Sequence, residues 1–94
     1  MTFSPEEKLQ LKMDDVVWRE VAGELVVLEL STSVYLTLNG TAKLLWEALS
    51  GGATTETLVE TLTREYDIGP DQARTDVEGF LEALTHRNLL VHAT

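Results

Sequence analysis

The sequence contains no cysteine, few basic residues and no long hydrophobic run. The lack of cysteine excludes disulfides and thiolate metal ligands. No apolar stretch approaches the ~20 residues of a membrane-spanning helix, and the opening residues MTFSPEEKLQ lack the apolar core of a signal peptide. We therefore expect a cytoplasmic protein that does not enter a membrane.

The scarcity of lysine and arginine argues against a nucleic-acid partner. Seven basic residues stand against sixteen acidic ones, which gives a net charge of −9 at pH 7. Proteins that bind nucleic acids draw their sequence-independent affinity from basic side chains placed on phosphates. Here the basic residues are few and scattered, so we expect no binding to DNA or RNA.

Catalytic and metal-binding patterns are missing as well. The two histidines, His86 and His92, have no second histidine or carboxylate at metal-ligand spacing. The stretch GGATTE superficially suggests a phosphate loop but lacks the lysine that such a loop requires. We predict no enzymatic activity, no metal and no cofactor.

What is present indicates one folded domain over residues 14–94, preceded by a polar tail over residues 1–13. Three β-rich runs, at 16–21, 25–30 and 34–38, are separated by loops of three residues. Runs of this length and spacing are typical of an antiparallel meander in which the middle strand pairs on both sides.

Alternation along these runs assigns the two faces of the sheet. The core-facing set would be Val26, Leu28, Leu30, Val34, Leu36 and Leu38. The outward set would be Val27, Glu29, Tyr35 and Thr37, with Val17 or Trp18 beside them.

Helical spacing of apolar residues follows from residue 42 onward in three segments, the third of which spans 70–87 and opens at Pro70. The order predicts an α+β domain with a winged helix-turn-helix-like fold. A winged helix that reads DNA needs a basic recognition helix. The third helix is net acidic, with Asp71, Asp76, Glu78 and Glu82 against Arg74 and Arg87.

The run VYLTL, residues 34–38, would form an edge of the sheet. It carries no proline, no lysine and no other charged residue, and these are the residues that usually protect an exposed edge. Either another part of the domain covers this edge, or the edge is open to receive an added strand.

The segments YLTLNGTAKLLWEAL with the following GG, TETLVETLTREYDI, and DVEGFLEALTHRNLLV resemble the PqqD-like family. These are the leader-recognition elements of the biosynthesis of ribosomally made, modified peptides (RiPPs). The resemblance spans residues 16–91, and within the family the chain is most similar to the discrete leader-binding proteins of lasso-peptide pathways. It implies a domain that takes a precursor's leader as an antiparallel strand and presents it to a transglutaminase-like cysteine protease.

Carried over to this chain, the resemblance puts the leader-binding backbone groups on Val34, Tyr35, Leu36, Thr37 and Leu38. It puts the wall of the groove on Asp76, Val77, Phe80, Leu81 and Leu84. Three other readings stay open: a recognition element for another RiPP-modifying enzyme, an acidic winged-helix regulator, and a subunit of an enzyme whose active site lies elsewhere.

Overall fold

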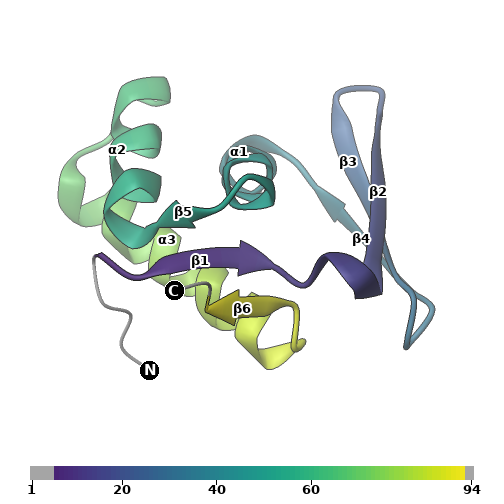
Figure 1. Cartoon of the computed structure of the whole chain (residues 1–94). Helices are drawn as coiled ribbons and strands as arrows, with labels where there is room; N and C mark the ends of the chain where they lie inside the picture. The colour runs from purple at the N-terminus through teal and green to yellow at the C-terminus, as the bar shows by residue number, and fades with distance from the viewer. Residues whose placement is uncertain (1–5, 93–94) are drawn as a thin grey trace.

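The computed structural model describes residues 6–92, which form two small antiparallel sheets and three helices (Figure 1). The elements are β1 (Lys8–Leu11), a 3₁₀ turn η1 (Met13–Asp15), β2 (Val16–Val21), β3 (Glu24–Glu29), β4 (Val34–Leu38), α1 (Gly40–Ser50), β5 (Ala53–Thr54), α2 (Thr55–Glu65), α3 (Pro70–His86) and β6 (Leu90–His92). The predicted α+β class, a three-stranded meander followed by three helices, is confirmed.

The larger sheet has the strand order β2-β3-β4, with antiparallel pairing throughout. Ala22 and Gly23 connect β2 to β3 and have φ angles of 54° and 84°. Positive φ at both central residues is the signature of a type I′ turn, whose twist matches that of the strands it joins. The sheet is therefore a tight meander in which β3 is the central strand.

The second sheet, with the order β5-β1-β6, was not predicted. Its central strand, β1, lies inside the stretch that we expected to be a polar tail, and Leu9 and Leu11 are buried in the core. The tail prediction is therefore wrong for residues 8–11, because two alternate leucines are enough to bury one face of so short a strand. The first five residues of the tail lie outside the described residues, and the domain bound at residue 14 stays a prediction.

The predicted faces are correct for β4 and wrong for β3. Val27 is fully buried, whereas Leu30 is exposed and Val26 and Leu28 are only half-buried on the outer face. Alternation along the strand predicts an outward position for Glu29. It lies on the inner face instead, because Arg87 from the end of α3 pairs with it there at 2.7 Å.

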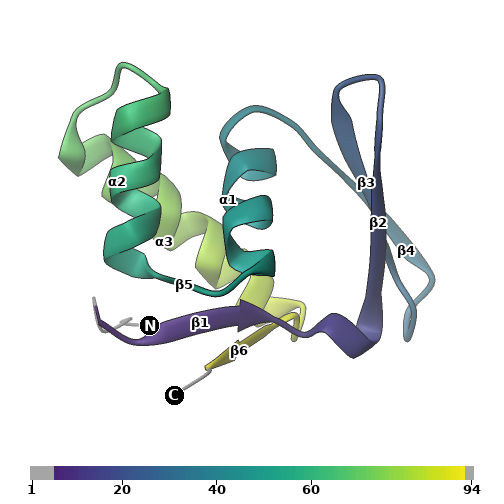
Figure 2. The same cartoon turned by 45° about the horizontal axis from the view of Figure 1, so that its top comes forward.

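Helix α1 lies between the larger sheet and the pair formed by α2 and α3 (Figure 2). Its buried residues are Leu45, Trp46 and Leu49. The ring of Trp46 meets that of Trp18 edge-on, with 5.4 Å between ring centroids and 85° between planes. This contact fixes the inner face of the sheet to the helical layer. No helix among residues 6–92 is both long enough and apolar enough to cross a membrane.

Candidate functional site

Strand β4 is an edge of its sheet. Within residues 6–92 it pairs with β3 alone, from Leu25 opposite Leu38 to Glu29 opposite Val34. Strand β2 is the other edge of this sheet. It carries the charged residues Arg19 and Glu20, and Glu20 pairs with Lys43 at 3.2 Å. Charges of this kind discourage the addition of a further strand. Strand β4 carries none, so it is the unprotected edge of the two.

The backbone hydrogen bonds determine which residues of β3 face which neighbour. The N–H of Leu30 donates to the carbonyl oxygen of Asp15 at 2.8 Å, which extends the β2–β3 ladder by one pair. In an antiparallel pair, hydrogen-bonded and non-bonded positions alternate. The residues of β3 whose backbone groups point to β2 are therefore Glu24, Val26 and Leu28.

The intervening residues of β3 point their N–H and C=O groups to β4. Opposite them in the register stand Val34, Leu36 and Leu38, whose backbone groups are bonded to β3. The N–H and C=O groups of Tyr35 and Thr37 consequently point away from the sheet at its free edge. The edge thus offers two donors and two acceptors, a detail that the sequence left open.

Helix α3 brings only part of its predicted set to the surface. Val77, Leu81 and Leu84 are buried in the core, so their side chains are not available to a peptide in this structure. Asp76 is half-buried, and Phe80 is a partly buried side chain that packs against the core. Of the five α3 residues in the predicted groove wall, these two are the ones that a ligand could reach.

Residues at three- and four-residue spacing share one face of a helix. Asp76, Phe80, Ala83 and Arg87 have this spacing, and we call them the α3 face. Arg87 donates from a guanidinium nitrogen to the Glu29 carboxylate at 2.7 Å, so this face is turned toward the sheet. Because Glu29 stands opposite Val34, the same bond holds the end of α3 near the start of β4.

Sequence reasoning missed the role of Arg87, which the pattern of α3 alone shows only as an exposed cation. It also missed Gly79, which has no side chain, and Ala83, which has only a methyl group; both line a shallow hollow along α3. The hollow has a volume of about 510 Å³ and is lined by Gly79, Glu82, Ala83, His86 and Arg87. Small residues one helical turn apart were the signal that could have indicated it.

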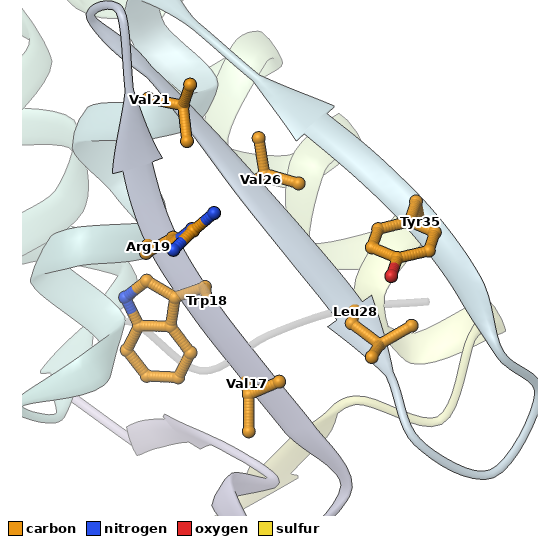
Figure 3. Close-up of a pocket in the computed structure, with 7 residues that line it drawn as sticks. All are labelled: Val17, Trp18, Arg19, Val21, Val26, Leu28 and Tyr35. Carbon is orange, nitrogen blue, oxygen red and sulfur yellow. The ribbon is translucent and has the colours of Figure 1, made fainter.

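A second hollow, of about 470 Å³, lies on the outer face of the sheet (Figure 3). It is lined by Val17, Trp18, Arg19, Val21, Val26, Leu28 and Tyr35. In Figure 3 the indole of Trp18 points off the edge of β2, while the aliphatic side chains and Tyr35 lie over the strands. The side chains that line this hollow are apolar apart from Arg19, the indole N–H of Trp18 and the tyrosine hydroxyl.

The described part of the chain holds no group of three or more histidine, cysteine, aspartate or glutamate residues that could bind a metal ion. The candidate site is therefore a backbone edge with apolar surroundings. Such an arrangement suits the recognition of an extended chain by main-chain hydrogen bonds.

Comparison with known proteins agrees with this geometry. Residues 24–90, well over half of the chain, match the family described as "Coenzyme PQQ synthesis protein D (PqqD)". No curated protein sequence matches the chain.

Two solved structures share the fold. One is "TbiB1 in Complex with the TbiA(beta) Leader Peptide", with 28% identity and a TM-score of 0.77 over 100% of this chain and 99% of that one. The other is "Lasso peptide synthetase B1 complexed with the leader peptide", with 22% identity and a TM-score of 0.78 over 88% of this chain and 96% of that one. At its lower identity, the second comparison bears on the fold alone. The resemblance noted from the sequence is thus confirmed, and the chain belongs to the PqqD family.

Proposed function

We propose that this chain binds the leader segment of a ribosomally made precursor peptide by strand addition at the free edge of β4, beside the α3 face. The observation that carries the proposal is the uncharged, proline-free edge on which the backbone groups of Tyr35 and Thr37 point outward. The structure of a chain 28% identical to this one in complex with a leader peptide supports it.

The backbone groups alone are too few to account for tight binding. A net hydrogen bond contributes about 0.5–1.5 kcal/mol, so the four groups at Tyr35 and Thr37 contribute about 2–6 kcal/mol. A micromolar Kd requires about 8 kcal/mol. The remainder would come from apolar side chains of the leader that meet Leu36 and Phe80 on the inner side of the added strand.

We further propose that the domain presents the bound leader to the cysteine protease that removes it, in the biosynthesis of a lasso peptide. Because the precursor is made by ribosomes, we place this encounter in the cytoplasm. A recognition role for another RiPP-modifying enzyme is the second candidate, favoured by the family's description as a coenzyme PQQ synthesis protein. The genes that neighbour this one distinguish the two, because lasso biosynthesis requires a short precursor gene beside a papain-like protease and an asparagine-synthetase-like cyclase.

Two proline substitutions test strand addition. Proline has no N–H, and it is tolerated on an edge strand where that N–H faces solvent. Thr37→Pro removes an outward donor, so we expect a folded domain that no longer binds a labelled synthetic leader of the neighbouring precursor. Leu36→Pro removes a donor bonded to β3, so we expect a lower melting temperature.

Thermal melting and fluorescence anisotropy measure the two outcomes. If Thr37→Pro stays folded and binds the leader with unchanged affinity, strand addition at β4 is refuted. If Thr37→Pro unfolds while Leu36→Pro does not, then the assignment of inward and outward backbone groups along β4, which was derived from the bond between Leu30 and Asp15, is wrong.

A further inference from the structure

The turn that leads into β4 is held by a side chain from an earlier part of the chain. Asp15, at the end of η1, accepts two hydrogen bonds from Ser31: its Oδ1 accepts from the backbone N–H at 3.1 Å, and its Oδ2 accepts from the hydroxyl at 2.9 Å. The carbonyl oxygen of Asp15 accepts from the N–H of Leu30 at 2.8 Å. The short turn between β1 and β2 that carries Asp15 lies at this end of the larger sheet (Figure 1). Asp15 thus bonds to two consecutive residues of the turn.

The turn needs such support. Residues 30–35 are all exposed, so burial contributes little to their order. Ser33 has a φ angle of 58°, in the left-handed region that residues with a side chain seldom adopt. Its N–H donates to the carbonyl oxygen of Glu29 at 2.8 Å and closes the turn. A strained backbone conformation persists where surrounding contacts determine it, and here the two bonds to the Asp15 carboxylate provide such contacts.

The turn lies directly before the groups that we propose to bind the leader. Val34 is the first residue of β4 that pairs with β3, and it alone separates Ser33 from Tyr35, which carries the first outward N–H and C=O groups. Thr37 lies farther along the strand, between two residues whose backbone groups are bonded to β3. Disorder in the turn would therefore release the backbone of Tyr35 and leave that of Thr37 in place.

We infer that Asp15 is a positioning residue for leader binding, which it supports through Ser31 without touching the leader. By holding the turn, Asp15 keeps the N–H and C=O groups of Tyr35 in the direction that an added strand needs. A binding group that is already ordered spares the complex the entropic cost of ordering it. This inference rests on the proposed function and adds a residue from outside β4 and α3 to those on which leader binding depends.

Substitutions at Asp15 separate positioning from charge. Asp15→Ala removes both acceptors, whereas Asp15→Asn keeps an oxygen for the N–H of Ser31 and an amide that can donate to the hydroxyl oxygen. Asp14→Ala is the matched control, because it removes one negative charge from an exposed aspartate of the same turn. Three quantities are measured for each variant: affinity for the labelled synthetic leader, the free energy of unfolding in urea, and amide hydrogen exchange of the free domain by NMR.

For Asp15→Ala we expect leader affinity to fall about tenfold, equivalent to ~1.4 kcal/mol, because the turn must then be ordered during binding. In the free domain we expect faster exchange of the Ser33 amide, whose hydrogen bond closes the turn, and unchanged exchange of the Leu36 amide, which points to β3. Asp15→Asn should restore most of the affinity. Asp14→Ala should bind leader as the unsubstituted domain does.

Ser31→Ala provides a milder test if Asp15→Ala does not fold, because it removes the hydroxyl bond and keeps the backbone one. We expect it to give a smaller loss of affinity. Unchanged affinity in both variants would overturn the inference, and so would an equal loss in Asp14→Ala, which would mark an effect of charge. Faster exchange at both Ser33 and Leu36, with a matching loss of unfolding free energy, would assign Asp15 to general stability instead. Failure of the unsubstituted domain to bind leader would refute the proposed function.

Discussion

Phe80 lies between the core and the surface of α3, and this intermediate position defines its role. It packs against buried residues but stays partly exposed on the α3 face, close in sequence to Gly79, which has no side chain, and to Ala83. The resemblance seen in the sequence placed Phe80 in the groove wall together with Val77 and Leu81. It could not separate Phe80 from Val77 or Leu81, because all three fit one broad apolar stripe and only packing against the rest of the chain decides which are covered.

We expect Phe80→Ala to weaken leader binding more than tenfold, which corresponds to above ~1.4 kcal/mol, while the domain stays folded. The matched control is Ile68→Ala, which truncates another partly buried apolar residue that precedes α3 and lies outside the α3 face. Binding is measured by titration with labelled leader, and folding by far-UV circular dichroism. Equal losses of affinity in both variants would mean that Phe80 acts through general stability.

At the level of the elements, the extents of β2, β4 and α3 follow from the sequence, because alternation, turn residues and Pro70 mark them clearly. The inner face of β3 did not follow. The two faces of β3 are equally apolar, with Leu25 and Val27 on one and Val26 and Leu28 on the other. The prediction therefore depended on the assumption that Glu29 faces outward, and that assumption was wrong. A carboxylate can lie inward when a cation far along the chain meets it, and local sequence does not reveal such a partner.

The bond between Arg87 and Glu29 joins α3 to the sheet and yields a prediction for both. Arg87→Met would leave the buried Glu29 carboxylate without its partner, and an unpaired buried polar group costs about 1–3 kcal/mol, or more when charged. We expect the free energy of unfolding, measured by urea denaturation, to fall by at least that amount. The exposed Arg74, on the same helix, provides the control Arg74→Met.

Replacing both partners, as in Glu29→Met with Arg87→Met, should recover most of the lost stability, because a buried ion pair can be exchanged for apolar residues at little cost. The double variant should nevertheless bind leader less tightly, since the apolar pair no longer fixes the distance between α3 and the start of β4. A double variant with full stability and full affinity would show that the ion pair has no part in positioning the helix.

For the molecule as a whole, the order of elements was predictable and the second sheet was not. Strands β1 and β6 come from opposite ends of the described chain, and each is too short to give a periodic signal by itself. Their pairing depends on the helices that bring the two ends together. The order of helices and strands could therefore be predicted from local patterns in the sequence. The second sheet could not, because it depends on pairing between segments that are distant in the sequence.

The whole-molecule charge predicts the outcome of a direct binding assay. The fold is winged-helix-like, yet α3 is net acidic and the chain carries a net charge of −9. We expect no sequence-dependent DNA binding at physiological salt in a fluorescence titration. A sub-micromolar affinity that varies with DNA sequence would contradict this reading and favour a regulatory protein.

The open edge of β4 also has a consequence for the protein when no peptide is present. Two such edges can also pair with each other, so an empty domain is at risk of joining a second copy in a continuous sheet. Mutual repulsion between chains of charge −9 opposes that encounter. At an ionic strength near 1 M the screening length shrinks to about 3 Å. We therefore expect the acidity of the chain to oppose pairing between two vacant β4 edges, and concentrated salt to weaken that opposition.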